Sequence, residues 1–344
     1  MRTIQLIIAI LLFPLSIWYA VGVAVRNICF RHGILKSVPT SIPTIGIGNL
    51  RMGGTGKTPH TEYLIRLFSD KHTALLSRGY GRKTKGFVLA DGTNSARELG
   101  DEPAMISHKF PDLTVAVCED RVEGVERLSQ ENNPPELVLL DDVYQHRQIK
   151  PTLMILLTEY GDPFFEDRIL PFGNLREFRS GSRRADIIVV TKCPPLMSET
   201  KRNEYRRKLK LSSKQALFFS NIDYQQPQPL YNGTEWQPVK KVLLVTGIAN
   251  PTPLIHHIEK QCTVKHLNFP DHHDFTATDC QQIIKAFNTI KETSKAVITT
   301  EKDAMRLLSP SIKEMLQELP IFYIPIQVSF LEGDTFDKAI KKII

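Results

Sequence analysis

Residues 44–58, with the sequence TIGIGNLRMGGTGKT, constrain the fold of this chain more than any other stretch. A short apolar, β-branched run at 44–47 leads into a glycine-rich turn that ends in Lys57 and Thr58. Apolar residues between 63 and 68 then recur at helical spacing, which predicts a strand, a loop and a helix in that order. In a loop of this kind, backbone N–H groups and the helix N-terminus converge on a phosphate group. The sequence therefore predicts a nucleotide site in an α/β domain of the phosphate-loop NTPase type, with a mostly parallel sheet.

The residue types in this loop suit the binding of ATP and Mg²⁺. Lys57 is expected to reach the β- and γ-phosphates of ATP, and the Thr58 hydroxyl is expected to ligate Mg²⁺. The glycines allow the backbone to approach the phosphates closely. The expected nucleotide-binding residues are Arg51, Met52, Gly53, Gly54, Thr55, Gly56, Lys57 and Thr58. The strict phosphate-loop pattern has a glycine at the position of Arg51, so a glycine-rich turn that binds nothing is the alternative.

Composition narrows the classes of partner. The chain has 344 residues, enough for two domains, and 44 Lys and Arg against 37 Asp and Glu give a formal charge of +7. This surplus suits an anionic lipid or a phosphorylated substrate. The sequence has no long basic tract and no nucleic-acid motif, so we expect no nucleic-acid partner, and nothing in it implies an obligate protein partner. The five cysteines form no C-x-x-C pair and are interpreted as reduced thiols.

The amino-terminal stretch 3–25 contains no charged residue. As a helix it would approach the thickness of a bilayer core, with Trp18 and Tyr19 suited to the interface and basic residues following from Arg26. We predict a membrane-associated helix at 1–27 that holds the protein on the cytoplasmic side. A buried core helix is the alternative, and Pro14 leaves open whether the helix spans the bilayer or lies in its surface. A cleaved signal peptide is disfavoured because no small-residue cleavage site is evident.

Polar groups follow several short apolar runs between 73 and 191. The predicted strand 137–140 is followed by Asp141 and Asp142, the form in which a buried strand delivers carboxylates to Mg²⁺. Arg78 follows the predicted strand 73–76 in the run SRGYGR, which suits an anion, with a solvated turn as the alternative. The other predicted strands here are 87–90, 113–118, 153–158 and 187–191, and the motif GDEP at 100–103 opens a predicted helix.

Two further segments contain candidate site residues. Arg176 lies in a basic loop at 169–186, for which a solvated loop and a grip on phosphate or lipid headgroups are both open. His272 and His273 lie between two aspartates, where a metal site is conceivable, although adjacent histidines seldom share an ion.

The domain prediction follows from composition along the chain. Residues 224–238 are rich in Gln, Pro, Asn and Gly and are expected to be a linker. It separates a phosphate-loop domain at 28–223 from a smaller α/β domain at 239–344. The strands predicted in the smaller domain are 241–246, 265–269, 296–300 and 322–328, with a helix at 279–290.

Taken together, these motifs resemble the tetraacyldisaccharide 4'-kinase family of lipid A biosynthesis. The matching runs, in the family's order between residues 44 and 308, are GNLRMGGTGKTP, LSRGYGR, GDEP, LDDVYQHR, ILPFGNLRE, VVTKCP, GIANP, FPDHHDF and TTEKDAMRL. One departure is Val143, where the family usually has glycine. The resemblance implies transfer of the γ-phosphoryl group of ATP to the 4'-hydroxyl of tetraacyldisaccharide 1-phosphate at the cytoplasmic face of the bacterial inner membrane.

The resemblance also implies roles for individual residues. Asp101 of GDEP corresponds to the catalytic base, and His272 of FPDHHDF to its partner in a dyad. Asp141 and Asp142 correspond to metal-associated carboxylates. Further polar positions near the reacting groups, taken as substrate-binding candidates, are Arg78, Glu102, Arg121, Gln145, His146 and Arg176.

Two other functions would account for parts of the sequence. A membrane-associated ATPase switch of the partitioning type shares the deviant loop, but it usually has lysine at the position of Met52 and would leave GDEP and the histidine pair without a role. A non-catalytic membrane scaffold leaves Lys57 and the aspartate pair unexplained. Dependence of ATP consumption on a lipid acceptor separates the kinase from the switch.

Overall fold

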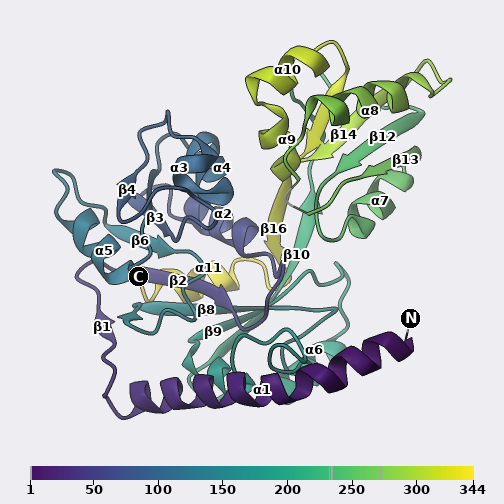
Figure 1. Ribbon diagram of the computed structural model, residues 1–344. Coiled ribbons are helices and arrows are strands. Elements are labelled where there is room, and N and C mark those ends of the chain that lie inside the picture. Colours follow the sequence, from purple (N-terminus) through teal and green to yellow (C-terminus); the bar gives the residue numbers. More distant parts are fainter. Residues whose placement is uncertain (1, 232, 234, 272) are drawn as a thin grey trace. The chain divides into compact units, whose positions relative to one another are not determined.

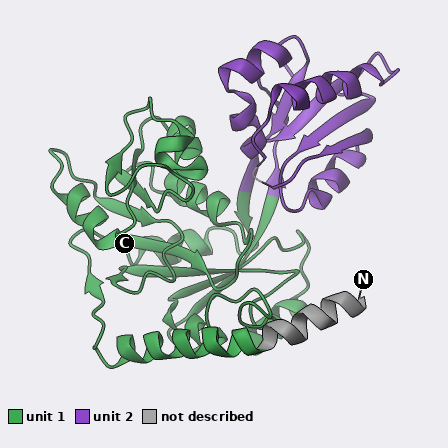
Figure 2. Cartoon of the chain, viewed as in Figure 1, with its two compact units in different colours: residues 1–222, 328–344 green, residues 223–327 purple. Residues whose placement is uncertain are grey.

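The computed structural model describes residues 2–231, 233, 235–271 and 273–344, and for residues 2–13 it describes the backbone alone. The chain forms two compact units (Figure 2). Unit 1 comprises Met1–Ile222 together with Val328–Ile344, and unit 2 comprises Asp223–Gln327. The chain therefore passes between the units twice.

Unit 1 is built on a nine-stranded sheet with the strand order β16-β10-β9-β8-β2-β6-β3-β5-β4. Neighbouring strands from β10 to β5 pair in parallel, and β4 pairs antiparallel with β5. The strands are β2 (Thr44–Asn49), β3 (Thr73–Ser77), β4 (Val88–Leu89), β5 (Thr114–Val117), β6 (Leu137–Leu140), β8 (Leu153–Glu159), β9 (Ile187–Thr191), β10 (Ala216–Tyr224) and β16 (Ile326–Phe330). Two short strands, β1 (Val38–Pro39) and β7 (Ile149–Lys150), form a separate parallel pair.

The sequence of the central strands explains their position. Every residue of β2 and of β6 is buried, which is typical of parallel strands covered on both faces. This confirms the predicted α/β class with a mostly parallel sheet. Because the carboxyl ends of parallel strands meet at one edge, the segments after β2, β3, β5 and β6 gather there. A Cβ on Gly48 would lie 2.6 Å from the Cβ of Tyr144, so the glycine allows the segment after β6 to pack directly on β2.

The helices of unit 1 precede, connect or follow these strands along the chain (Figure 1). They are α1 (Arg2–Arg31), α2 (Lys57–Leu67), α3 (Ala96–Leu99), α4 (Asp101–Lys109), α5 (Arg121–Ser129), the 3₁₀ helix η1 (Arg179–Arg184), α6 (Glu199–Leu209) and α11 (Thr335–Lys341). In α5, the side chain of Asp120 accepts hydrogen bonds from the backbone of Val122 and Glu123, a typical N-cap.

Helix α1 lies along unit 1 (Figure 1) and is held there by polar contacts. The backbone N–H of Phe172 donates to the Ser16 hydroxyl at 2.9 Å, and the Tyr19 hydroxyl donates to the Arg176 carbonyl at 2.7 Å. Near its carboxyl end, Arg26 donates to the carbonyl of Gln145 at 2.8 Å. Apolar side chains that remain exposed along the helix are Leu15, Ile17, Trp18, Val21, Val25 and Ile28. Among the residues searched, none of the helices combines the length and hydropathy needed to cross a bilayer.

Unit 2 has a five-stranded sheet with the order β11-β15-β14-β12-β13. Its strands are β11 (Gln228–Pro229), β12 (Lys241–Thr246), β13 (Thr263–Asn268), β14 (Lys295–Thr300) and β15 (Ile321–Ile324), and its helices are α7 (Thr252–Glu259), α8 (Ala277–Asn288), α9 (Glu301–Leu307) and α10 (Pro310–Leu316). Helices α8 and α10 share a buried apolar cluster with β12 and β14 that includes Leu243, Ile283, Val297 and Leu316. The predicted strands 241–246 and 296–300 and the predicted helix 279–290 are confirmed to within two residues.

The chain differs from the sequence analysis near the boundaries of unit 2. The stretch 322–328, predicted as one strand, is divided between β15 of the five-stranded sheet and β16 of the nine-stranded sheet, because Pro325 lacks the N–H that continues a ladder. The stretch 224–238, predicted as a linker, contains the end of β10 and the short strand β11. Residues 328–344 belong to unit 1, whereas the sequence analysis placed them in the smaller domain.

Candidate active site

The glycine-rich loop joins β2 to α2 at the carboxyl edge of the sheet. Gly53 has a φ of 106° and Gly56, which directly precedes α2, has a φ of 87°. Both angles lie in the left-handed region that favours glycine. A Cβ on Gly53 or Gly54 would meet no atom within 4 Å, so the backbone here borders open space. This geometry is that of a phosphate-binding loop at a helix N-terminus.

Side chains of neighbouring elements hold the outer side of this loop. Asn49 at the end of β2 donates to the Thr55 hydroxyl at 2.7 Å. The Thr191 hydroxyl at the end of β9 donates to the Thr55 carbonyl at 2.9 Å, and His60 of α2 contacts the Gly56 carbonyl at 2.7 Å. The backbone conformation of the loop is therefore held by side chains from three neighbouring elements.

Lys57 and Asp142 meet at this edge. The Lys57 ammonium nitrogen lies 3.5 Å from Asp142 Oδ1, and a terminal guanidinium nitrogen of Arg176 lies 3.0 Å from Asp142 Oδ2. Burial acts to raise the pKa of Asp142, but the charges of Lys57 and Arg176 outweigh burial and hold that pKa below its usual range. Asp142 is thus an ionised carboxylate between two cations, and its backbone has a φ of 45°.

Asp141, the residue before it, has the opposite electrostatics. Its Oδ2 accepts from the Ser77 hydroxyl at 3.3 Å, whereas Oδ1 is buried with no hydrogen-bond partner among the described residues. Burial, with Glu102 and Asp142 as neighbouring anions, raises the pKa of Asp141 above its usual range. A buried carboxylate oxygen without a partner is costly, and a cation beside it would remove that cost.

These groups fit a magnesium site of the phosphate-loop kind. In such sites the protein contributes a hydroxyl and a carboxylate, while phosphates and water complete the octahedron. Thr58 in the first turn of α2 would supply the hydroxyl, and the partnerless Oδ1 of Asp141 would supply the carboxylate. In the described part of the chain, no three His, Cys, Asp or Glu side chains are grouped closely enough to form a metal site from protein ligands alone.

Asp101 and Glu102 form the first turn of α4, directly after Gly100. Gly100 has a φ of 92°, and a Cβ there would lie 2.8 Å from the carbonyl oxygen of Tyr80. The glycine thus allows the GDEP segment to pack against the loop that follows β3. Glu102 is close enough to Asp141 to raise its pKa, which brings the GDEP motif to the aspartate pair.

The remaining polar candidates surround the aspartate pair. Gln145 donates to the Asn49 carbonyl at 2.8 Å and accepts from Arg176 at 3.3 Å. His146 has its pKa lowered to about 4 by burial and by the charges of Arg121 and Arg78, so it is neutral at physiological pH.

Arg121 is only 1% exposed, and its guanidinium donates to the carbonyls of Cys118 at 2.6 Å and of Asp141 at 3.3 Å. These contacts join the ends of β5 and β6, so Arg121 positions the backbone of Asp141. Burial lowers the pKa of Arg121 to about 10, which leaves it charged.

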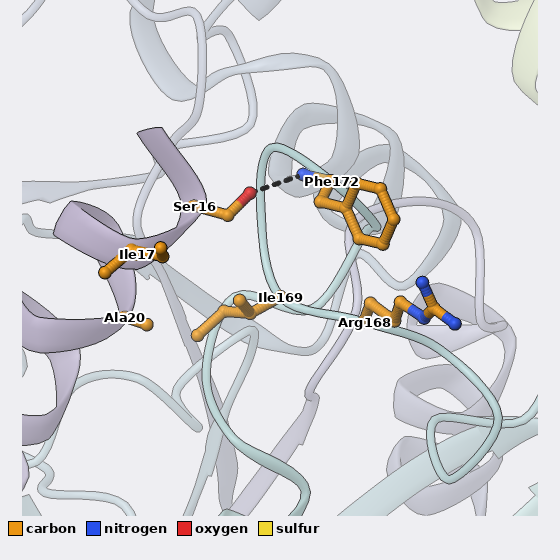
Figure 3. Close-up of a pocket in the computed structure, with 6 residues that line it drawn as sticks. All are labelled: Ser16, Ile17, Ala20, Arg168, Ile169 and Phe172. Atoms are coloured by element: carbon orange, nitrogen blue, oxygen red, sulfur yellow. Dashed lines mark hydrogen bonds between the residues drawn. The ribbon is translucent and has the colours of Figure 1, made fainter. Parts of the chain in front are cut away.

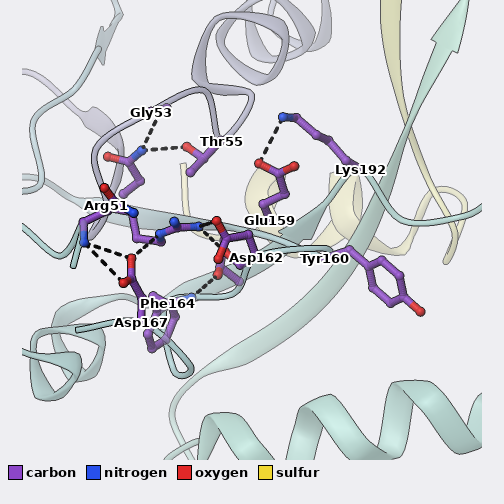
Figure 4. A network of polar contacts seen from close by, with 12 residues as sticks. Arg51, Gly53, Thr55, Glu159, Tyr160, Asp162, Phe164, Asp167 and Lys192 are labelled. Atoms are coloured by element: carbon purple, nitrogen blue, oxygen red, sulfur yellow. Dashed lines mark hydrogen bonds and ion pairs between the residues drawn. The ribbon is translucent and has the colours of Figure 1, made fainter. Parts of the chain in front are cut away.

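Two of the predicted nucleotide-binding residues make other contacts. The Arg51 side chain forms an ion pair with Asp162 and another with Asp167, the latter at 2.6 Å (Figure 4). The Met52 N–H donates to the carbonyl of Asn174 at 2.8 Å. Both contacts attach the start of the loop to the segment after β8, and nucleotide binding by Arg51 or Met52 stays a prediction.

A shallow cavity lies between α1 and the segment 168–172 (Figure 3). Its volume is about 370 Å³, and its lining is mostly apolar. The lining residues are Ser16, Ile17, Ala20, Arg168, Ile169 and Phe172. An apolar surface therefore lies along the segment that continues to Arg176.

Comparison with known proteins decides the family. A family model described as tetraacyldisaccharide-1-P 4'-kinase (LpxK) matches residues 8–344. The chain belongs to the tetraacyldisaccharide 4'-kinase family. It is 45% identical to a tetraacyldisaccharide 4'-kinase of Flavobacterium johnsoniae, over 97% of this chain and 96% of the relative, and 44% identical to one of Parabacteroides distasonis, over 93% and 90%.

A solved structure extends this similarity to the fold of a kinase of the family. The crystal structure of LpxK from Aquifex aeolicus in complex with ATP is similar to this chain with a TM-score of 0.76 at 28% identity. The similarity covers 98% of this chain and 99% of that one. The family resemblance inferred from the sequence motifs is confirmed.

The structure brings most of the predicted tetraacyldisaccharide 4'-kinase site residues to one edge of the unit 1 sheet. His272 lies outside the described residues, so its pairing with Asp101 stays a prediction. Sequence reasoning missed Asn49, Thr191 and His60. Only His60 had a local signal, since a residue four positions after Gly56 lies on the same helix face.

Proposed function

We propose that this chain transfers the γ-phosphoryl group of ATP to the 4'-hydroxyl of tetraacyldisaccharide 1-phosphate. The observation that carries the proposal is the meeting of Lys57, Asp142 and Asp141 beside an open phosphate loop. The relatives named for this activity share nearly the whole length of the chain. The motifs that a kinase needs and a nucleotide switch does not, GDEP and FPDHHDF, are also present.

Lys57 is the cation proposed to stabilise the transferring phosphoryl group. Its ammonium nitrogen lies 3.5 Å from Asp142 Oδ1, and this pairing keeps the charge of Lys57 beside the loop. Arrival of the triphosphate gives Lys57 a more highly charged partner, while Arg176 continues to balance Asp142 at 3.0 Å. Thr58 and Asp141 would hold Mg²⁺, which neutralises charge on the β- and γ-phosphates when bound.

Asp101 is proposed as the base that accepts the proton of the 4'-hydroxyl. A sugar alcohol is a weak acid, so a carboxylate within hydrogen-bond reach assists its attack on phosphorus. At the start of α4, Asp101 is exposed, whereas Glu102 lies close enough to the buried Asp141 for its charge to raise the pKa of Asp141. We assign His272, by the family motif alone, as the residue that orients Asp101.

The remaining polar candidates are proposed to bind the phosphorylated disaccharide. Arg78 follows β3 and is exposed, and its charge reaches His146. A neutral His146 donates or accepts hydrogen bonds without adding to the positive charge. Gln145 and Arg176 are already joined by a hydrogen bond, so they present an ordered pair to a sugar or a phosphate.

The membrane is proposed as the surface on which the enzyme meets its acylated substrate. The polar contacts of Ser16, Tyr19 and Arg26 attach one side of α1 to unit 1. Trp18, at 76% the most exposed large apolar side chain among those described in α1, suits insertion into a lipid interface. We propose attachment to the cytoplasmic face of the bacterial inner membrane, with α1 lying in the interface.

The deciding experiment measures transfer of label from γ-labelled ATP to purified tetraacyldisaccharide 1-phosphate. The wild-type protein should label the lipid and consume little ATP without it. Lys57→Ala should lower turnover by about a hundredfold to a thousandfold, because transition-state charge loses a fixed partner. Lys201→Ala, which removes an ion pair with Glu204 on α6, is the matched control and should leave turnover unchanged.

Two outcomes would contradict this function. ATP consumption that is equally fast with and without the lipid acceptor would favour the partitioning-type ATPase. Near-normal phosphoryl transfer by Lys57→Ala would remove the glycine-rich loop from the reaction.

A further inference from the structure

His60 is a buried residue of α2 that neither the motifs nor the reaction accounts for. Its side chain is 4% exposed. The Nδ1 atom lies 2.7 Å from the Gly56 carbonyl oxygen, and the Nε2 atom lies 2.8 Å from the Ser220 hydroxyl on β10. The ring also packs edge-on against Phe330 of β16, at a centroid distance of 6.1 Å.

The chemistry of these partners fixes the tautomer of the imidazole. A carbonyl oxygen only accepts hydrogen bonds, so Nδ1 carries the proton and donates to Gly56. In the neutral ring Nε2 is then an acceptor, and the Ser220 hydroxyl donates to it. Burial lowers the pKa of His60 to about 4, so the neutral form is the one present at physiological pH.

The contact with Gly56 determines how the next amide is presented. The peptide unit between Gly56 and Lys57 is planar and trans, so its N–H points opposite to its carbonyl. Drawing the Gly56 carbonyl toward His60 therefore turns the Lys57 N–H away from the helix interior, toward the open side of the loop. An amide at this position of a phosphate loop is a phosphate ligand.

The helix backbone alone holds this carbonyl less well. The His60 N–H also contacts the Gly56 oxygen, but at 3.3 Å, longer than the 2.7 Å side-chain contact. Gly56 has a φ of 87° and no side chain, so its peptide unit has few other restraints. The Ser220 hydroxyl contacts Nε2, on the side of the imidazole away from Gly56, and so fixes the orientation of the ring. The ring in turn holds the Gly56 carbonyl.

We propose that His60 is a positioning residue for ATP binding, which holds the Gly56 carbonyl so that the Lys57 N–H faces the phosphates, with Ser220 orienting the imidazole. The inference rests on the proposed function in that it requires ATP to bind this loop. It does not depend on the acceptor or on the catalytic base. Direct measurement of ATP affinity therefore tests it separately from phosphoryl transfer.

Two conservative substitutions separate positioning from general stability. The amide nitrogen of asparagine occupies roughly the place of Nδ1, and that of glutamine roughly the place of Nε2. His60→Asn therefore keeps the donor to Gly56, whereas His60→Gln loses it and keeps a group near Ser220. Each variant gives up one hydrogen bond, so their melting temperatures should fall to a similar extent.

The affinity for ATP, measured by titration calorimetry without the lipid acceptor, should differ between the two variants. His60→Gln should weaken binding about tenfold, the upper range for one lost neutral hydrogen bond. His60→Asn should stay within about twofold of wild type. Tyr63→Phe is the matched control, since Tyr63 lies one turn further on α2, packs on Phe330 and bonds Asp337, but does not contact the loop.

Ser220→Ala tests the second contact. It should weaken ATP binding about threefold in the wild-type background and have no effect in the His60→Gln background if the imidazole transmits its influence. Equal losses of affinity in His60→Asn and His60→Gln, or a loss in Tyr63→Phe as large as that in His60→Gln, would overturn the proposal. Wild-type protein that binds no ATP at all would contradict the proposed function instead.

Discussion

Acid sensitivity at His60 is the prediction whose magnitude the structure defines best. The unfolded chain protonates this histidine near its ordinary pKa of 6.5, whereas the folded chain does so only near 4. As the pH falls below 6.5, His60 becomes protonated in the unfolded state but not in the folded state. The free energy of unfolding therefore decreases. The loss grows until the pH reaches about 4, where the folded state also becomes protonated.

The size of the effect follows from linkage. At about pH 5 the difference between the unfolded pKa of 6.5 and the folded pKa of about 4 lowers the free energy of unfolding by about 2 kcal/mol. At about pH 7.5 the same difference lowers it by almost nothing. His60→Asn removes the titrating group and one hydrogen bond, which costs about 1 kcal/mol at either pH. The variant should therefore be less stable than wild type by about 1 kcal/mol at neutral pH, and more stable by about 1 kcal/mol at about pH 5.

The measurement must report unit 1 alone, because two units need not unfold together. Hydrogen exchange of peptides from α2 and β10, corrected for the intrinsic exchange rate at each pH, gives the free energy of opening that part of unit 1. His146 also has a lowered pKa, but it is present in both proteins and cancels in the difference. A stability difference that stays the same at both pH values would refute the buried, neutral assignment of His60.

Three further predictions concern other parts of unit 1. Asp101→Ala should lower turnover by about a hundredfold or more with little change in ATP affinity. A variant that loses only ATP affinity, measured by calorimetry, would assign Asp101 to nucleotide binding. Arg51→Ala should destabilise unit 1 by about 3 kcal/mol, because it leaves Asp167, whose side chain is 11% exposed, without its cation. Hydrogen exchange of peptides from unit 1 checks this, and unchanged stability with weakened ATP binding would restore Arg51 to the nucleotide site. Trp18→Glu should reduce sedimentation with anionic lipid vesicles without changing the melting temperature, and undiminished binding would place the attachment surface elsewhere.

Several elements could be predicted because short-range sequence determines them. The order strand, loop, helix at 44–68 is confirmed by β2 and α2, since a buried parallel strand, positive φ angles and a helical repeat each leave a local pattern. The run 137–140 is confirmed as β6 for the same reason. The stretch 322–328 was predicted wrongly as a single strand, because which sheet each half joins depends on partners remote in sequence.

The residues of the candidate site likewise include some that the sequence predicted and others whose contacts only the structure shows. Lys57 and the aspartate pair were found from sequence because a phosphate loop and a strand-end carboxylate need particular residue types at particular spacings. The contacts of Arg51 with Asp162 and Asp167 have no such spacing, since they join segments more than a hundred positions apart. The same holds for the contact between His60 and Ser220.

The amino-acid sequence by itself determined the family, the nucleotide loop and the carboxylates that accompany it, because these depend on residue type and local order. Only the tertiary structure decided the pKa values of the carboxyl groups in the site. Asp141 and Asp142 are neighbours with the same side chain, yet burial beside Glu102 raises one pKa, while Lys57 and Arg176 lower the other. The difference arises from the surroundings of each carboxylate in space, because desolvation depends on burial and Coulomb interaction depends on distance. The order of residues specifies neither burial nor distance.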